Sequence, residues 1–201
     1  MHTVVFYYKR NNEIKHQSVI LLSDSTVHDT AAVYIMQQKV IPFIKETCPK
    51  ARNIIYATDG AKQHYKNKFQ MANLVKHKDD FGLEGEWHYH ATAHGKGACD
   101  GLGAVLKKEA TRASLQASAT ECILNKESLV IWAKRKFPTI KIFDYSKQDH
   151  TRIQRSLAKR FSTAPSVMGI TKGHQILIKE SRQLVIMRYS GAQTALTVVT
   201  Y

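Results

Sequence analysis

The sequence is poor in cysteine and proline, and it has no long hydrophobic run. Its three cysteines, Cys48, Cys99 and Cys122, form no CxxC pair, so neither a disulfide framework nor a zinc ribbon is predicted. No run approaches about 18 apolar residues, which excludes a predicted membrane span. The first residues also lack the basic, apolar and small-residue order of a signal peptide. Unpaired cysteines suit a reducing compartment, so we expect an intracellular protein.

Acidic residues are scarce relative to basic ones. The 201 residues carry 30 Lys and Arg against 16 Asp and Glu, a formal net charge of +14. From His150 onward, the chain has eight Lys and Arg residues and one acidic residue, which gives a local charge of +7. Such an excess favours a polyanionic partner, most simply nucleic acid, although a solvated basic surface is the alternative.

The residue patterns predict a mixed α/β chain, and the apolar fraction of 43% is enough for a core. The expected elements are strands at 3–8 and 17–23 forming a hairpin, a helix at 30–47, a strand at 53–58, a helix at 64–77, a strand at 84–93 and a helix through 102–113. Further along they are a helix at 127–136, a strand at 139–143, a basic helix at 148–161 and short strands between 167 and 201. The strand at 53–58 is nearly all apolar, which predicts burial on both faces.

Two aspartates stand where apolar strands lead into glycine-containing turns. Asp59 follows the strand at 53–58 and precedes Gly60, whereas Asp100 precedes Gly101 at the start of a helix. Carboxylates held at element ends suit Mg²⁺ or Mn²⁺ binding beside a phosphate. Each also has an ordinary structural role, a turn for Asp59 and a helix N-cap for Asp100.

Basic residues surround both acids, and this favours the metal and phosphate interpretation. The candidate nucleic-acid-binding residues are Lys62, His64, Lys66 and Lys68 after Asp59, His94 and Lys96 before Asp100, and Arg152, Arg155, Lys159 and Arg160 in the basic helix. Glu109 is a rival third acid on the helix after Asp100.

Two other chemistries stay open. His88, His90, His94 and Cys99 form a candidate zinc set, because His88 and His90 share one strand face, but they lack the usual closed spacing. Cys99 beside His94 is a candidate nucleophile, because a helix N-terminus lowers a thiol pKa. No Walker phosphate loop or dinucleotide-binding fingerprint is present.

Three motifs resemble those of a group of mobile-element-derived metazoan proteins. They are the segments TDGAKQHYKN, DFGLEGEWHY and HGKGACDG, which match S-D-G-x-A-x-Q-Y-K-N, D-F-G-x-x-x-E-W-H-F and H-G-K-x-A-C-D-G. The likeness extends back through VVFYYK and LLSDSTVHDT and forward to about Ser190. This group resembles DDE/D-type transposases with a ribonuclease H-like fold.

The resemblance implies roles for individual residues. It implies Asp59 as the middle catalytic acid and Asp100 as the last, both as Mg²⁺ or Mn²⁺ ligands, while Trp87, His94 and Lys96 match motif positions without a settled role. Glu109 stands where the group has an apolar residue, which argues against a catalytic part. The group carries its first acid on a strand upstream of the hairpin, and this chain begins at the equivalent of the second strand.

These observations predict an α/β, ribonuclease H-like mixed sheet flanked by helices, lacking its first strand, with a basic helical and β-rich C-terminal part. We expect a partial core at 1–120, a helical continuation at 121–165 and a β-rich tail at 166–201. The expected function is a transposon-derived DNA-processing domain, an inactive remnant as it stands, in the nucleus. The alternatives are a non-catalytic nucleic-acid-binding module and a zinc-dependent structural or interaction protein.

Overall fold

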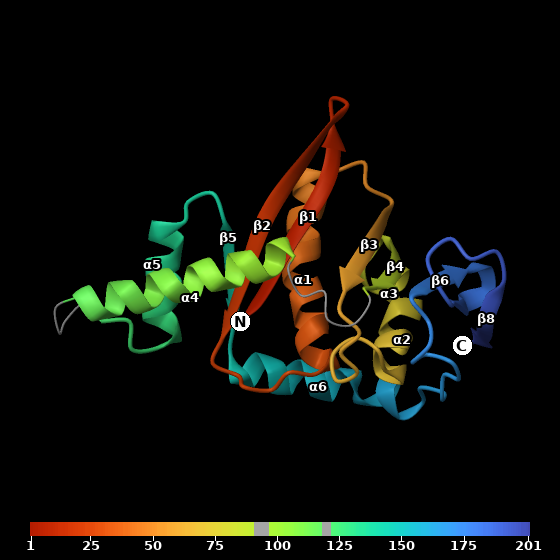
Figure 1. Ribbon diagram of the computed structural model, residues 1–201. Coiled ribbons are helices and arrows are strands. Elements are labelled where there is room, and N and C mark those ends of the chain that lie inside the picture. Colours follow the sequence, from red (N-terminus) through yellow and green to blue (C-terminus); the bar gives the residue numbers. More distant parts are fainter. Residues whose placement is uncertain (91–96, 118–121) are drawn as a thin grey trace. The chain divides into compact units, whose positions relative to one another are not determined.

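The computed structural model describes residues 1–90, 97–117 and 122–201. Within these ranges the chain is a mixed α/β protein with six α-helices and two mixed sheets (Figure 1). It divides into two compact units that interleave in sequence. Unit 1 comprises Met1–Thr26 and Gly95–Thr151, and unit 2 comprises Val27–His94 and Arg152–Tyr201. This division differs from the three consecutive segments predicted above.

Unit 1 is a three-stranded sheet with the strand order β1-β2-β5. Its elements are β1 (His2–Arg10), β2 (Glu13–Ser23), α4 (Ala98–Gln116), α5 (Lys126–Lys136) and β5 (Lys141–Tyr145). β1 and β2 form the predicted hairpin, and β5 pairs parallel to β2. The hairpin turn is only Asn11 and Asn12, whose φ angles of 51° and 67° are left-handed. Asparagine tolerates this conformation, so both strands run closer to the turn than predicted.

The core of unit 1 lies between this sheet and helices α4 and α5. Ile20 and Leu22 of β2 pack with Leu106 of α4, Val130 of α5 and Ile142 of β5, and all five side chains are buried. Leu106 lies on the apolar face that the sequence predicted for this helix. Burial of this shared apolar surface stabilises the pairing of elements more than 100 residues apart in the chain.

Unit 2 is a five-stranded sheet with the strand order β3-β4-β6-β7-β8. Its elements are α1 (Thr30–Thr47), β3 (Asn53–Thr58), α2 (Lys68–Val75), α3 (His77–Phe81), β4 (Glu84–Tyr89), β6 (Gln175–Lys179), the 3-10 helix η1 (Glu180–Arg182), β7 (Gln183–Met187) and β8 (Ala195–Thr200). Helix α6 (Lys147–Ser162) starts in unit 1 and continues into unit 2. β3 and β4 are parallel, and the other pairs are antiparallel. The C-terminal strands therefore extend the sheet of β3 and β4.

Helix ends follow the capping residues. Asp29 caps α1 by accepting a hydrogen bond from the Ala32 N–H at 2.9 Å. The predicted helix at 64–77 is wrong in its bounds, because the Asn67 side chain accepts from the N–H groups of Phe69 and Gln70 and starts α2 at Lys68. The segment then breaks before α3, which ends at Gly82 with a left-handed φ of 70°.

The prediction that β3 is buried on both faces is also wrong. Its residues alternate between exposed and half-buried, and the Ile55 side chain is 58% exposed. β3 stands at an edge of its sheet, with β4 as its partner in the part of the chain that the structure describes. An edge strand covered on one side shows such alternation even when its sequence is apolar throughout.

A buried polar chain joins α1, β3 and α3 inside unit 2. The Tyr56 hydroxyl lies 2.8 Å from His77 Nε2, and His77 Nδ1 lies 2.6 Å from the carbonyl oxygen of Leu83. A carbonyl can only accept, so Nδ1 carries the proton and Nε2 accepts from Tyr56, which itself accepts from Gln37. Gly85 of β4 lies so close that an added Cβ would come within 2.9 Å of the His77 ring.

This arrangement predicts that unit 2 loses stability in mild acid. Burial lowers the pKa of His77 from its ordinary 6.5, against the opposing effects of the Leu83 carbonyl and Asp80. Near pH 6.5, His77 therefore binds a proton in the unfolded chain but stays neutral in the folded chain. The free energy of unfolding falls as pH drops below about 6.5. Urea unfolding between pH 7.5 and about 5 tests this in a Trp132→Phe background, where Trp87 reports on unit 2.

The matched control is His77→Gln, which removes the titrating group. Its free energy of unfolding should depend less steeply on pH over the same interval. Equal pH dependence in the two proteins would contradict the assignment of His77 as a buried, neutral histidine.

Candidate nucleic-acid interface

Asp59 stands at the carboxyl end of β3, in the first residue after the strand. Its side chain is exposed, and one carboxylate oxygen accepts from the Ala61 N–H at 3.1 Å, which closes a tight turn. The indole N–H of Trp87 donates to the Thr58 hydroxyl at 2.8 Å and fixes the preceding residue. The predicted turn role of Asp59 is thus confirmed, and the turn also presents the carboxylate to solvent.

Aromatic side chains support this turn from inside the unit. The rings of Trp87 and Tyr56 stack at 4.3 Å, and the Tyr65 ring lies 5.6 Å from Trp87. The Tyr89 hydroxyl donates to the Tyr65 carbonyl at 2.7 Å. The segment that carries the cations after Asp59 is therefore held against the inner face of β4.

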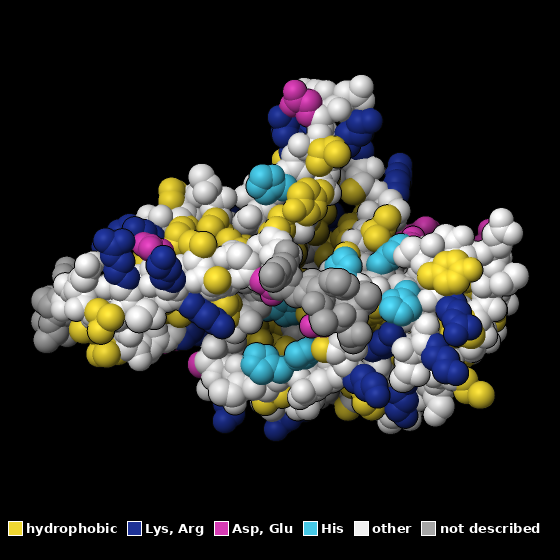
Figure 2. All heavy atoms as spheres, viewed as in Figure 1, with side chains coloured by type: hydrophobic (Ala, Val, Ile, Leu, Met, Phe, Trp, Pro, Cys, Tyr) yellow, Lys and Arg dark blue, Asp and Glu magenta, His cyan; other side chains and the backbone are white. Residues whose placement is uncertain are grey.

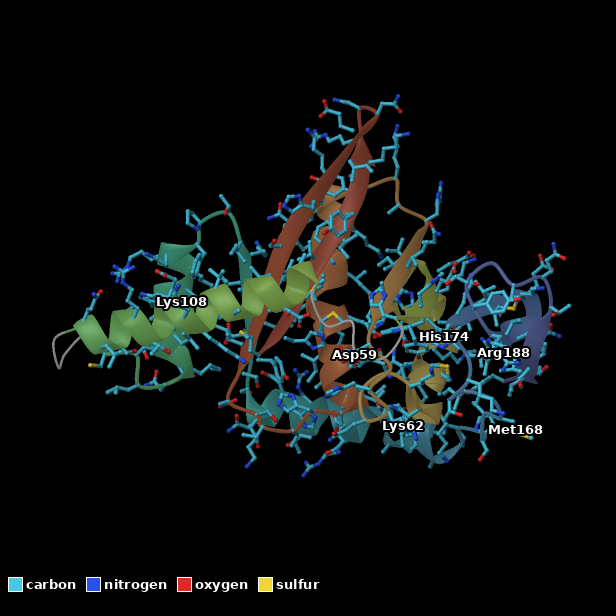
Figure 3. All side chains as sticks on the ribbon, in the orientation of Figure 1. Asp59, Lys62, Lys108, Met168, His174 and Arg188 are labelled. Atoms are coloured by element: carbon cyan, nitrogen blue, oxygen red, sulfur yellow. The ribbon has the colours of Figure 1, made fainter. Side chains whose placement is uncertain are left out.

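The four predicted basic residues after Asp59 differ in their surroundings. Lys62 is exposed, and Figure 3 shows it on the same segment as Asp59. Lys66 is 9% exposed, with its ammonium 4.9 Å from the centre of the Tyr89 ring. Burial lowers the pKa of the Lys66 ammonium, and the charge of Lys62 adds to this effect. Lys68, half-buried, lies over the Phe69 ring.

His64 is half-buried against a second histidine, His28. Its ring lies edge-on to that of His28 at 5.8 Å. Burial and the neighbouring His28 lower the pKa of His64, while Asp59 and Asp29 oppose them. The negative charge of Asp59 therefore acts on the His64 ring, which stands five residues further along the chain.

Asp100 lies in the first turn of α4 and is exposed. One of its carboxylate oxygens accepts from the Gly97 N–H at 3.1 Å. Gly97 is the N-cap of α4 and Asp100 is the third helical residue, so the prediction of Asp100 as the N-cap is wrong, although its side chain does cap the helix start. Asp100 belongs to unit 1 and Asp59 to unit 2, and their meeting in one site stays a prediction. His94 and Lys96 lie outside the described residues. Glu109 pairs with Lys136 at 3.3 Å, which gives it a structural partner.

The described residues of the candidate zinc set, His88, His90 and Cys99, do not form a metal-binding cluster. Both ring nitrogens of His88 are engaged, Nδ1 by the Ser190 hydroxyl at 2.8 Å and Nε2 by the Glu86 carboxylate. Within residues 1–90, 97–117 and 122–201, no group of three or more His, Cys, Asp or Glu side chains is placed to hold a metal ion. The expected low pKa of Cys99 is wrong, because burial raises the pKa of this thiol and Asp100 raises it further.

Helix α6 sorts its basic residues by face. Ile153 and Leu157 are buried, whereas Arg152, Arg155 and Lys159 are exposed. These three follow each other at intervals of three and four residues, so they share one outward face of the helix. Asp149 in the first turn is the acidic residue of α6, and no further acidic residue occurs between 150 and 179, so basic residues predominate along the rest of the helix. Figure 2 shows that basic side chains also lie over the C-terminal strands of unit 2.

Arg160 differs from its neighbours on α6. Its guanidinium donates to both carboxylate oxygens of Asp80, at 2.6 and 2.9 Å, and to the Asn73 side chain at 3.1 Å. It also lies over the Tyr34 ring at 5.7 Å. These contacts tie α6 to helices α1, α2 and α3, so we remove Arg160 from the candidate nucleic-acid-binding residues.

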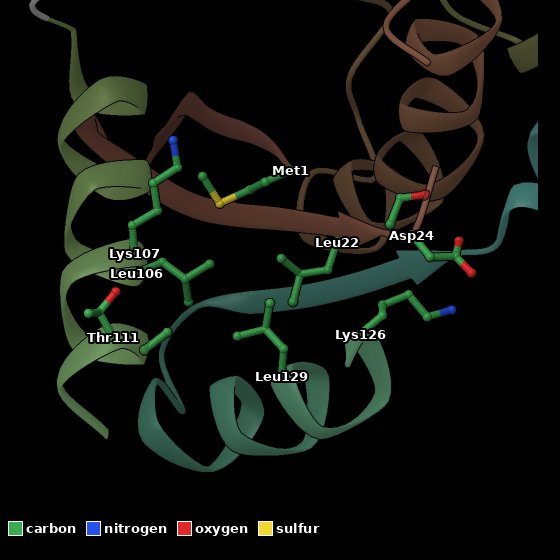
Figure 4. Close-up of a pocket in the computed structure, with 10 residues that line it drawn as sticks. Met1, Leu22, Asp24, Leu106, Lys107, Thr111, Lys126 and Leu129 are labelled. Atoms are coloured by element: carbon green, nitrogen blue, oxygen red, sulfur yellow. The ribbon is translucent and has the colours of Figure 1, made fainter. Parts of the chain in front are cut away.

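A separate cavity of about 460 Å³ opens in unit 1 (Figure 4). Its apolar wall includes Leu22, Leu106 and Leu129, which belong to or pack against the core of this unit. Lys126 lines it as well and lies 3.4 Å from the carboxylate of Asp144. Neither Asp100 nor the exposed face of α6 contributes to its lining as described, so the cavity is separate from the basic interface.

The contacts of Arg160 predict that its loss affects stability and not the affinity for polyanions. Arg160→Ala removes two charged hydrogen bonds to Asp80 and should lower the free energy of unfolding by about 1.5–3 kcal/mol. Lys159→Ala, its neighbour on the exposed face, is the control and should change stability by less than about 0.5 kcal/mol. Urea unfolding of both variants measures the difference. Equal losses of stability would contradict the structural role of Arg160.

Among the helices of the described residues, none has the length and apolar character needed to cross a membrane. No curated protein matches the chain, and no solved structure matches it. One family model, described as a domain of unknown function (DUF8701), matches residues 1–190. Because this match covers nearly the whole sequence, the chain belongs to the DUF8701 family.

Proposed function

We propose that this chain is a nucleic-acid-binding domain of the DDE/D transposase type, related to ribonuclease H-like proteins, that binds the backbone of DNA in the nucleus. The exposed basic face of α6, defined by Arg152, Arg155 and Lys159, is the observation that carries the proposal. Cations on a rigid helix keep their spacing, and they lose little conformational freedom of the backbone when they bind phosphates.

The dimensions of this face suit a row of phosphates. Arg152 and Lys159 are seven residues apart, which is about 10 Å along a helix. Duplex DNA carries one negative charge per ~1.7 Å of its axis, so this length meets several phosphates. Each cation that neutralises a phosphate releases a counterion, and this release drives binding at low salt.

The order of elements supports the transposase-type part of the proposal. The β1–β2 hairpin, helix α1 and strand β3 follow each other, Asp59 comes directly after β3, and β3 and β4 are parallel. Asp59 is exposed at the strand end, with Lys62 and His64 on the next turn. We propose that Asp59 lies beside the bound phosphate and that Mg²⁺ or Mn²⁺ binds there.

An exposed carboxylate such as that of Asp59 fits a divalent metal that is held by one or two protein acids, waters and phosphate oxygens. The metal would supply charge stabilisation at the phosphate and an activated water. The chain's own residues would bind and orient the backbone, with Lys62 next to the acid. Two acids alone support two-metal chemistry poorly, so we propose binding, and not cleavage, as the activity of these 201 residues.

The α6 face predicts a measurable change in the salt dependence of DNA binding. Replacing Arg152, Arg155 and Lys159 together with alanine should reduce the slope of log K against log salt by about 2.7, at ~0.9 for each phosphate contact. Fluorescence anisotropy with a labelled duplex at several salt concentrations measures this slope. The control replaces Lys39, Lys50 and Lys179, which are exposed elsewhere on unit 2, with the same loss of charge. Equal slopes for the two triple variants would refute the α6 interface.

The location of Asp59 beside the phosphate predicts an effect of metal on affinity. In EDTA, Asp59→Asn should bind DNA about fivefold more tightly than the native chain, because two like charges ~4 Å apart repel by about 1 kcal/mol in water. Mg²⁺ should tighten binding by the native chain and not by the variant. Glu46→Gln, an equal charge change on the exposed side of α1, is the control.

The same assay separates binding from nuclease activity. Identical behaviour of Asp59→Asn and Glu46→Gln in EDTA and in Mg²⁺ would remove Asp59 from the interface. Cleavage of the duplex in Mn²⁺ that disappears in both Asp59→Asn and Asp100→Asn would make the chain an active nuclease in place of a binding domain.

A further inference from the structure

A network of side chains on the outer face of the unit 2 sheet serves no part of the proposed DNA interface. Glu86 and His88 point to one side of β4, opposite to the buried Gly85, Trp87 and Tyr89. Their side chains are 22% and 25% exposed. Ser190 reaches this face from the segment that follows β7, 102 positions along the chain from His88.

The hydrogen bonds fix the direction of each proton. The Glu86 carboxylate can only accept, so the neutral His88 ring carries its proton on Nε2 and donates it to Glu86. Nδ1 then has a free lone pair, which accepts from the Ser190 hydroxyl at 2.8 Å. A hydroxyl bonded to an imidazole whose other nitrogen is held by a carboxylate is the arrangement of a base-activated serine.

Gln175 closes the network and holds both of its ends. Its amide nitrogen donates to Glu86 Oε1 at 2.7 Å, and its amide oxygen accepts from the Gly191 N–H at 3.0 Å. Gln175 stands directly across from His88 in the register of β4 and β6. The carboxylate and the backbone next to Ser190 are therefore positioned by the same side chain, which keeps the hydroxyl against the base.

We propose that Ser190 is a nucleophile that takes an acyl group from small esters, with His88 as its general base and Glu86 and Gln175 as positioning residues. Ser190 is exposed, so an ester can approach it from solvent without entering a cavity. Figure 3 shows Arg188 and His174 in the same C-terminal part of unit 2. The proposal stands independently of DNA binding.

The proposed reaction conserves atoms and charge. The Ser190 Oγ forms a bond to the ester carbonyl carbon while its proton passes to His88 Nδ1. The carbon–oxygen bond to the leaving alcohol breaks, and the alcohol departs with the proton from His88. Water then attacks the acyl carbon and gives a proton to His88. The bond from that carbon to Ser190 Oγ breaks, the proton returns from His88 to Oγ, and the carboxylic acid is released.

Labelling by a fluorophosphonate probe tests the nucleophile. With the full chain, peptide mass spectrometry should locate the label on Ser190, and p-nitrophenyl acetate should acetylate the same residue. Ser190→Ala should remove both modifications. Ser162→Ala, which changes an exposed serine at the end of α6, should leave both in place. A native chain in which Ser190 stays unlabelled while other serines react would overturn the proposal.

A chemical rescue separates a catalytic His88 from one that only supports the fold. In His88→Gly the rate of labelling at Ser190 should fall by at least about 100-fold, and added imidazole should restore part of the rate. Glu86→Gln, which keeps the shape of the side chain, should slow labelling as well and should not respond to imidazole. Labelling of His88→Gly at the native rate, or a slow rate that imidazole leaves unchanged, would overturn the role of His88.

Discussion

The alternation of side chains along β4 is the constraint on which the candidate sites of unit 2 depend. One face of the strand sends Trp87 and Tyr89 into the unit, where they hold the turn that carries Asp59 and the segment that carries Lys66. The other face holds the network of Glu86 and His88 with Ser190. A shift of β4 by one residue against β3 would exchange these faces and dismantle both arrangements.

The basic residues of the chain fall into two groups, those packed within the fold and those exposed to solvent. Arg160 and Lys66 lie against acids or aromatic rings, where they join elements of the fold. The exposed face of α6 and Lys62 keep their charges toward solvent. The excess charge read from composition is therefore larger than the charge that is presented to a partner, and the proposed interface relies on the outward group.

Local signals in the sequence predicted most of the helices and strands. Helix α1 has the predicted bounds because Asp29 caps it and an apolar stripe runs through it, and both are features of neighbouring residues. The start of α2 could have been placed at Lys68, because Asn67 is a good capping residue, but the periodicity of the segment concealed it. The helical spacing of α6 also indicates that Arg160, and not Lys159, lies beside the buried residues. Arg160 follows the buried Leu157 by three residues, which places the two on the same side of the helix.

Contacts between distant segments could not be predicted in the same way. The pairing of β5 with β2 and of β6 with β4 joins strands that are far apart in the sequence, and no local pattern marks their partners. The apolar sequence of β3 indicated burial on both faces, but its place at the sheet edge exposes Ile55. The bond between Ser190 and His88 is of the same kind, because nothing near either residue points to the other.

Lysine footprinting in the presence and absence of duplex DNA tests the central claim most directly. An amine-acylating reagent labels exposed lysines, and mass spectrometry reports the labelling of each. DNA binding through the outward cations predicts that Lys62 and Lys159 lose labelling when DNA is added, while Lys39 and Lys179 keep it. Protection of Lys39 and Lys179 with Lys62 and Lys159 still fully labelled would contradict the account.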